Sequence, residues 1–408
     1  MMHKICYFLR MAISIQTLFS STQTIYRLKC IAGADALQNY VSWMYYTEDL
    51  STLNFIRGGE LVLTTGMSIG RKEDNLGKKD DNYITEYLEE LVSKLVELKA
   101  SGLIVNVGKY IPEIPEAIIK LCDKLHFPIF TLPWEIHTID IMQDYGNRIV
   151  NDRQKVFKLE HTLNNAIFNT SEFNIGQLEN TSFVNAKCYS ILLLEFPEEF
   201  QDMEEAEFYR YMHYSFNVKT GLLPNDFCFF LHRNHIIYVF HEDCKEDAKQ
   251  IEKIARKDKH FKNKRIAISG TCNAAHELTK EYEHAYLALK LCNDETLFSD
   301  YSELGFFQLL GEISDRKVLE GMYNQIFGGL NSLSKEKLKD YLNTLKIYLN
   351  YSGCVQKTAE EGYTHRNTVN YRIKKICDML NIDMTDGHTR FMIQVALYIR
   401  ELLEKLDA

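Results

Sequence analysis

The side chains best suited to chemistry lie in one stretch near the C-terminus, THRNTVNYRIKKI at residues 364–376. Apolar residues recur there at steps of four, three and four, which predicts a helix with one buried face. They are Val369, Ile373, Ile376 and Leu380. The opposite face carries arginine, asparagine and lysine. Arginine can bond guanine bidentately, and asparagine can bond adenine in the same way, in the major groove of DNA. The predicted chemistry is therefore the reading of base edges.

The candidate contacts differ in what they would reach. The outward face of the helix, which would meet base edges, comprises Arg366, Asn367, Asn370, Tyr371 and Lys374. The residues expected to reach phosphates are Lys357, Arg372 and Lys375. Either Thr364 or His365 can cap the helix, whose N-terminus also attracts a phosphate. Thr368, in the first turn, completes the candidate set.

A second helix is expected directly before this one. The pattern predicts a short helix over residues 355–361, a tight glycine-marked turn over Gly362–Thr364, and the recognition helix from His365 or Arg366 onward. The small side chains of Thr358 and Ala359 would let the two helices cross closely, as a helix-turn-helix requires. For an arbitrary helix pair, a basic face that only contacts water is the more frequent case. That alternative stays open on these residues alone.

Composition limits where such a helix could act. The chain has 408 residues, 46% of them hydrophobic, so two to four domains are expected. A net charge of −9 argues against binding a polyanion with the whole surface. The charge is uneven, however, because residues 335–408 carry 12 basic and 10 acidic side chains. Only this segment is suited to nucleic acid.

The remaining composition favours the cytoplasm. Ten cysteines without a C-x-x-C pair indicate reduced thiols. Arg10 interrupts the apolar start and no cleavage site follows, so no signal peptide is expected. No uninterrupted apolar run approaches the 18 residues of a membrane span, so no membrane partner is expected.

Residues 41–133 alternate apolar runs with amphipathic stretches, which predicts a mostly parallel sheet covered by helices. A helix is then expected from about Ile136 to Phe168, with a narrow apolar stripe that includes Ile139. Two interpretations of this stripe remain: packing on the chain's own domains, or a dimer helix that also transmits a signal.

The middle of the chain predicts a different fold. Strands are expected over residues 188–196, 227–232, 236–241 and 265–270, with helices over about 243–257 and 276–292. Only Arg233, Asn234 and His235 would separate the middle two strands, which therefore form a hairpin. This order indicates an α+β domain with an antiparallel sheet.

Several segments resemble one family of bacterial transcription factors. THRNTVNYRIKKI with FMIQVALYIRELL (391–403) resembles the C-terminal helix-turn-helix of the purine catabolism regulator (PucR) family. SWMYYTEDL…IRGGELVLTTG (42–66), GLIVNVGKY (102–110) and LHFPIFTLP (125–133) are similar to its N-terminal domain. RIAISG…YEHAYLALKLC (265–292) is similar to its central GGDEF-like domain. The chain departs from the family pattern at Gly362 and Thr364, where a leucine and a β-branched apolar residue are usual.

The resemblance implies a multidomain chain of α/β and α+β folds. The expected parts are an α/β effector-sensing domain over 11–135, a connecting helix over 136–170, a non-catalytic GGDEF-like α+β domain over 171–300, and an all-α helix-turn-helix domain over 335–406. The implied function is a sequence-specific regulator that responds to a small-molecule effector of nitrogen or purine catabolism. The alternative is a catalytically inactive cyclase-like interaction protein that does not read DNA sequence. Residues 1–10 are expected to be an upstream extension.

Enzymatic and metal chemistry are not expected. The hairpin turn HRNH (232–235) has neither a glycine for close approach to phosphate nor a carboxylate for Mg²⁺. His232, His235, His241 and Cys244 match no standard zinc spacing. No G-x-S-x-G or Walker signature occurs. No catalytic residue, metal or cofactor is therefore assigned.

Ligands of open α/β sheets bind beyond the carboxyl ends of the strands. The effector candidates at these ends are Thr64, Thr65, Gly66, Asn106, Gly108, Pro133, Trp134 and Glu135. An equally weighted alternative is that they are turn residues only. Because one helix-turn-helix offers few base contacts, a homodimer or higher oligomer on a double-stranded DNA operator is expected.

Overall fold

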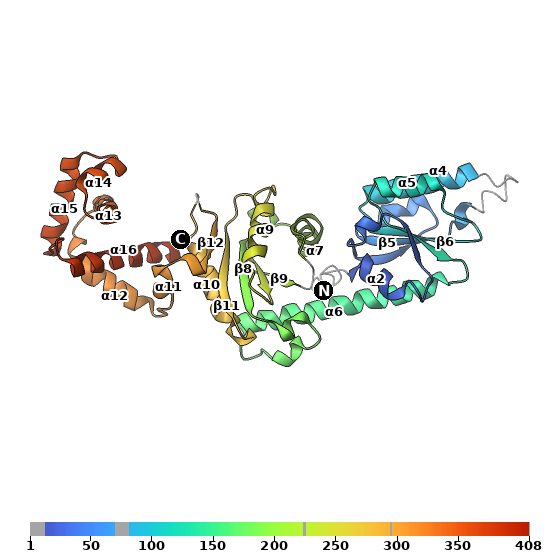
Figure 1. Ribbon diagram of the computed structural model, residues 1–408, viewed down its shortest axis with the longest axis horizontal. Coiled ribbons are helices and arrows are strands. Elements are labelled where there is room, and N and C mark those ends of the chain that lie inside the picture. The colour runs from blue at the N-terminus through green and yellow to red at the C-terminus, as the bar shows by residue number, and fades with distance from the viewer. Residues whose placement is uncertain (1–12, 70–80, 223–225, 294–295, 408) are drawn as a thin grey trace. The chain divides into compact units, whose positions relative to one another are not determined.

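The computed structural model describes residues 13–69, 81–222, 226–293 and 296–407 (Figure 1). The chain divides into two compact units. The first runs to Thr162 and includes Glu199–Gly221, and the second comprises Leu163–Glu198 and the chain from Leu222 onward. The expectation for residues 1–10 lies outside the described residues.

The first unit is built on a five-stranded sheet of order β2-β7-β6-β5-β4. The strands are β2 (Lys29–Ala32), β4 (Trp43–Tyr46), β5 (Glu60–Thr64), β6 (Gly102–Val107) and β7 (Ile129–Pro133). The pairs β4–β5, β5–β6 and β6–β7 are parallel, and only β2 runs antiparallel at the edge. The predicted mostly parallel sheet is therefore present. A small second sheet pairs β1 (Ile13–Ser14) with β3 (Tyr40–Val41).

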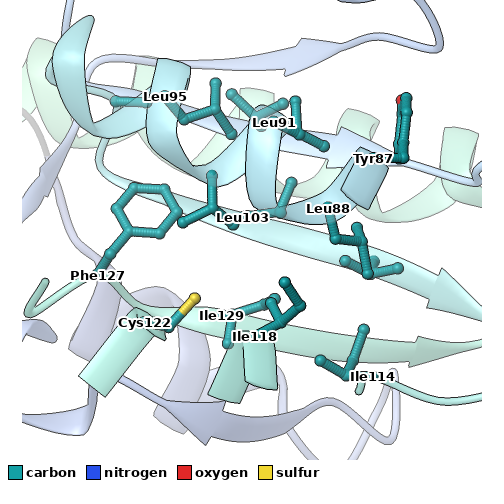
Figure 2. Close-up of a cluster of buried hydrophobic side chains, with 14 of the residues drawn as sticks. Tyr87, Leu88, Leu91, Leu95, Leu103, Ile114, Ile118, Cys122, Phe127 and Ile129 are labelled. Carbon is teal, nitrogen blue, oxygen red and sulfur yellow. The ribbon is translucent and has the colours of Figure 1, made fainter. Parts of the chain in front are cut away.

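Helices cover both faces of this sheet, because its central strands are apolar on both sides. On one face, α4 (Asp81–Glu97) and α5 (Glu116–Lys124) pack into a core that includes Leu88, Leu91, Leu103 and Ile118 (Figure 2). On the other face lie α2 (Ile15–Thr22) and the first part of α6 (Thr138–Phe168). The core there includes Leu18, Leu63, Ile141, Tyr145 and Ile149.

The long helix α6 packs on the chain's own domains near both of its ends, while its second interpretation, a dimer helix that also transmits a signal, stays a prediction. Ile141 and Ile149 are buried in the first unit, and Leu163 and Ile167 are buried in the second. Ile139 corrects the predicted stripe, because it is 63% exposed in the first turn.

The second unit contains an antiparallel sheet of order β12-β11-β8-β10-β9. The strands are β8 (Tyr189–Glu195), β9 (Phe227–His232), β10 (His235–Phe240), β11 (Ile266–Cys272) and β12 (Phe298–Asp300), of which β12 alone pairs in parallel. The helices between them are α9 (Lys245–Ala255) and α10 (Leu278–Leu291). The segment that precedes β9, in the first unit, contains α7 (Glu205–Arg210), a π-helix (Tyr211–Asn217) and α8 (Val218–Thr220). The predicted α+β domain with an antiparallel sheet is present, whereas its likeness to GGDEF domains stays a prediction.

The hairpin between β9 and β10 is one residue tighter than expected. Only Arg233 and Asn234 separate the strands, because His235 is the first residue of β10 and pairs with His232. Arg233 has a φ of 52°, a left-handed conformation that glycine usually supplies in such turns. The sequence interpretation missed this because arginine is not a turn signal.

The C-terminal part of the second unit is helical throughout. Its helices are α11 (Phe306–Gly311), α12 (Arg316–Phe327), α13 (Lys335–Asn350), α14 (Val355–Glu361), α15 (Arg366–Leu380) and α16 (Gly387–Asp407). Helix α12 packs against α16, and Phe327 and Leu330 enter the same core as Leu345, Val369 and Ile393. This core therefore draws on residues upstream of Lys335.

Among the described residues, no helix has the length and apolarity that crossing a membrane requires. The cysteines in the described part of the chain are all free.

Candidate functional site

The two helices predicted near the C-terminus form a helix-turn-helix with the expected limits. Thr358 and Ala359 of α14 are buried, at 1% and 8% exposure, where α14 meets α15. On α15, Val369, Ile373 and Ile376 are buried in the core. The short side chains of α14 thus allow the close crossing, and the apolar face of α15 holds it.

The turn uses its residues differently from the sequence interpretation. The left-handed position is Tyr363, with a φ of 44°, whereas Gly362 has an ordinary φ of −80°. Gly362 is needed for space, because a Cβ there would lie 2.9 Å from the carbonyl oxygen of Thr358. The backbone amides of Gly362 and Thr364 donate to the carbonyls of Thr358 and Ala359, which closes the end of α14.

Helix α15 begins with an open N-terminus. His365 is its cap, since Nδ1 accepts a hydrogen bond of 3.2 Å from the backbone amide of Asn367. Thr364, the other candidate cap, lies half-buried in the turn. Five predicted base-facing positions are exposed together on one face: Arg366, Asn367, Asn370, Tyr371 and Lys374. Thr368 is half-buried beside them.

The predicted cations fall into two groups. Lys357, Arg366, Lys374 and Lys375 are exposed, and none forms an ion pair or hydrogen bond with another described residue. Arg372 differs, because its guanidinium donates to Asp340 Oδ2 at 3.0 Å and to Thr344 Oγ1 at 2.9 Å. Arg372 therefore ties α15 to α13, while the other four side chains are available to an anionic partner.

Two features of this site were not expected from the sequence. Tyr363 is 98% exposed in the turn beside the N-terminus of α15. An aromatic residue next to the glycine of a turn was a signal that could have suggested it. Asp340 and Thr344, which hold Arg372, lie about thirty residues away in sequence, and no local pattern indicates that pairing.

The proposed effector residues lie at three neighbouring strand ends. Thr64, Asn106 and Pro133 are at or near the carboxyl ends of β5, β6 and β7, which are parallel and adjacent. The three loops therefore share one edge of the sheet. Trp134 is 38% exposed there, and its ring lies edge-on to Tyr110 with centroids 5.5 Å apart.

Several of these residues also have structural partners. The carboxylate of Glu48 accepts hydrogen bonds from the amide and hydroxyl of Thr65, at 2.7 and 2.6 Å, and from the amide of Met67 at 2.8 Å. Asn106 Nδ2 donates to the carbonyls of Leu132 and Pro133. The role of Glu48 could not be predicted from the sequence, because this residue lies before β5 whereas the loop that it bonds follows β5.

Gly66 and Gly108 allow close packing at the same edge. A Cβ on Gly66 would lie 2.6 Å from Ile111, and one on Gly108 would lie 2.8 Å from Trp134. Both glycines have positive φ angles, of 72° and 140°. Glu135, the last candidate, is exposed and 3.5 Å from Arg27.

The histidines and the cysteine near the β9–β10 hairpin have separate surroundings. His232 stacks on Phe168 with ring centroids 3.8 Å apart, and His235 lies edge-on to Tyr286. Burial lowers the pKa of both histidines and raises the pKa of Cys244 to about 12. Among the described residues, no three histidine, cysteine or acidic side chains gather in a way that could hold a metal ion.

The geometry of α14 and α15 defines a helix-turn-helix, the class of DNA-binding fold that inserts its second helix into the major groove. The chain matches the PucR C-terminal helix-turn-helix domain over residues 341–399. It also matches the Purine catabolism regulatory protein-like family over residues 19–149. The chain thus matches the models of two domains that are named for PucR-type regulators, one near each end.

Three curated proteins of Bacillus subtilis are similar to parts of the chain. The proline-responsive transcriptional activator PutR is 30% identical over 33% of this chain and 34% of its own length. The DNA-binding transcriptional activator AdeR is 26% identical over 40% of this chain and 39% of its own length. The purine catabolism regulatory protein is 33% identical over 21% of this chain and 16% of its own length. The matches to the first two thus span little more than a third of each relative.

Among solved structures, a regulator of polyketide synthase expression from Bifidobacterium adolescentis aligns with 60% of this chain and 96% of its own. The sequence identity is 14% and the TM-score is 0.25.

Proposed function

We propose that this chain is a transcriptional regulator that binds a double-stranded DNA operator through α15 and responds to a small-molecule effector through its N-terminal domain. The observation that carries the first part is the exposed face of α15. It presents Arg366 and Asn367 at an open helix N-terminus, with cations that have no partner within the described chain. A helix of 15 residues is about 22 Å long, enough to lie along a major groove.

The contacts within this interface would have separate roles. Arg366, Asn367 and Asn370 read base edges, while Lys357 and Lys375 neutralise phosphates. Arg372 acts indirectly, because its bonds to α13 fix the orientation of α15. Tyr363, with its ring in solvent at the turn, adds a contact to the sugar-phosphate backbone.

A homodimer or higher oligomer binds the operator. One helix-turn-helix makes few base contacts, so two half-sites spaced by a helical turn of DNA supply the affinity. The effector is a nitrogen-containing metabolite, in keeping with relatives named for responses to proline and to purine catabolism. The protein acts in the cytoplasm, where the chromosome lies.

The central α+β domain serves association rather than catalysis. Its strand order β11-β8-β10-β9 and its β9–β10 hairpin are compatible with a degenerate cyclase-like domain. The turn of that hairpin, Arg233 and Asn234, has no carboxylate for a metal ion.

The test is selection of duplexes from a random DNA pool by the full-length wild-type chain, followed by gel-shift titration at two salt concentrations. We expect a motif with two half-sites. Lys375→Ala should weaken binding to every duplex and lower the salt slope by about one. Lys317→Ala, which removes a positive charge from α12 outside the helix pair, is the matched control. Failure to enrich any motif would favour the interaction-protein alternative.

A further inference from the structure

A cavity of about 200 Å³ lies in the helical part of the second unit, where α11, α13 and α16 meet. Its apolar wall is formed by Phe307 of α11, Leu349 of α13, and Leu397 and Tyr398 of α16. The rings of Phe307 and Tyr398 lie edge-on, with centroids 5.2 Å apart. Leu397 is buried and the other three side chains are half-buried, so the cavity has an apolar floor that solvent can reach.

The mouth of this cavity carries one positive and one negative charge. Lys346 of α13 and Glu401 of α16 line it, and Lys346 Nζ lies 2.6 Å from Glu401 Oε2. The two side chains are 49% and 37% exposed, which places the pair at the rim. An ammonium has three N–H donors and a carboxylate has about four acceptor positions, and this contact uses one of each. The pair can therefore bind further polar atoms and keep its own contact.

The size and the charges of the cavity together select a class of ligand. A protein cavity of about 150 Å³ holds one benzene ring, so this one has room for an apolar side chain and a few more atoms. Glu401 repels an organic anion and Lys346 repels an organic cation. A zwitterion meets both charges favourably, because its ammonium can face the carboxylate and its carboxylate can face the ammonium.

We propose that this cavity binds a free α-amino acid with an apolar side chain. The ammonium of the ligand donates to Glu401, its carboxylate accepts from Lys346, and its side chain packs against Phe307 and Tyr398. Ammonium and carboxylate are attached to the same carbon atom of an α-amino acid, so both can reach a pair of charges only 2.6 Å apart. The site lies in the second unit, whereas the edge proposed for the effector belongs to the first, so this proposal stands apart from that role.

The first test is isothermal titration calorimetry on the full-length protein with L-phenylalanine and L-leucine at millimolar concentrations. Three related compounds each lack one part of the ligand: phenethylamine has no carboxylate, 3-phenylpropionate has no ammonium, and glycine has no apolar side chain. We expect at least one of the two amino acids to bind, and the three related compounds to bind roughly 10-fold more weakly or worse. If neither amino acid binds, or if a related compound binds equally well, the assigned class is wrong.

The second test places the ligand. Lys346→Met and Glu401→Gln should each lower the affinity for the amino acid by roughly 10-fold or more, because each removes one charge-assisted hydrogen bond. Asn350→Trp should also lower it, since this exposed residue at the end of α13 lines the cavity and a large ring there would obstruct the mouth. That variant keeps both charges, so it tests the cavity separately from the ion pair.

The matched controls are Lys94→Met and Glu90→Gln on α4, in the first unit. This ion pair also spans 2.6 Å, and its side chains are similarly exposed, at 44% and 54%. Exposed ion pairs contribute little to stability, so all four charge variants should melt as the wild type does. The amino acid should bind both control variants with unchanged affinity. If it binds the Lys346→Met, Glu401→Gln and Asn350→Trp variants as it binds the wild type, the ligand lies elsewhere and the proposal is wrong.

The outcome can be separated from that of the operator experiment. If the wild type selects no DNA motif but binds the amino acid in a way that depends on Lys346, only the DNA-binding proposal is overturned. If the operator is bound while no amino acid binds at the cavity, only the ligand site is overturned.

Discussion

Two arginines on α15, six residues apart, should have opposite roles. Arg366 is exposed and makes no bond within the described chain, whereas Arg372 bonds Asp340 and Thr344 of α13. We expect Arg366→Ala to weaken operator binding without loss of stability. We expect Arg372→Ala to lower stability and to affect DNA only through that loss.

The cost of removing Arg372 follows from its two bonds. The partly exposed ion pair with Asp340, whose side chain is 57% exposed, contributes about 0.2–1 kcal/mol. The hydrogen bond to Thr344 contributes about 0.5–1.5 kcal/mol. Thr344 Oγ1 still donates to the carbonyl of Asp340 at 2.8 Å, so no buried group is left unpaired. A loss of about 1 kcal/mol is expected, or roughly 2–4 °C in Tm.

Removing the Arg366 side chain should lower the affinity for the operator and leave the stability of the protein unchanged. A bidentate arginine–guanine pair contributes about 1–3 kcal/mol of discrimination. That corresponds to a loss of roughly 5-fold to 150-fold in operator affinity. The affinity for unrelated duplexes should fall much less, because the substitution removes only one positive charge that interacts with DNA phosphates.

The assay combines thermal melting with fluorescence anisotropy on the selected operator and on a scrambled duplex of equal length. Arg372→Lys serves as a control that keeps the charge but loses the fork of donors. The reasoning would be refuted if Arg366→Ala lowered Tm by as much as Arg372→Ala. It would also be refuted if Arg366→Ala bound both duplexes as tightly as the wild type.

Three further predictions follow from other contacts. Gly362→Ala should lower Tm, because the added Cβ would lie too close to the Thr358 carbonyl. Gly146→Ala in α6, where an added Cβ would have nothing within 4 Å, should raise stability by about 0.5–1 kcal/mol. A lower Tm for both variants in thermal melts would contradict this prediction. Burial lowers the pKa of His284, but hydrogen bonds to Glu281 and Glu312 outweigh it and raise the pKa. The stability from His284 is thus fully present below about pH 6.5 and is lost as pH rises through the raised value, so urea titrations should find His284→Phe most costly at low pH. Finally, the purified chain should form no cyclic dinucleotide from GTP with Mg²⁺ or Mn²⁺, and chromatographic detection of turnover would overturn the non-catalytic assignment.

The periodic features of the chain could be predicted well. The apolar steps at Val369, Ile373 and Ile376 defined the buried face of α15, and so also its outward face. The alternation over residues 41–133 indicated the parallel sheet, and hence the common edge of the three loops. Both signals are local, because helix and strand periods repeat within a few residues.

Single side chains within those elements could not be assigned in the same way. Period alone treats Arg372 and Arg366 as equally outward, and only the packing of α13 beside α15 shows that one is tied down. The turn between α14 and α15 depends on Tyr363 for its left-handed residue, although Gly362 is the usual sequence signal.

The sequence by itself determined the class of fold at each end of the chain and the face of α15 that could meet DNA. Tertiary structure decided which polar groups there already have partners. The pairing of Arg372 with Asp340 and the pairing of Thr65 with Glu48 are results of this kind. The physical reason is that pairing joins residues brought together by packing of separate elements, and hydrogen bonds of a few ångströms depend on positions that no local pattern encodes.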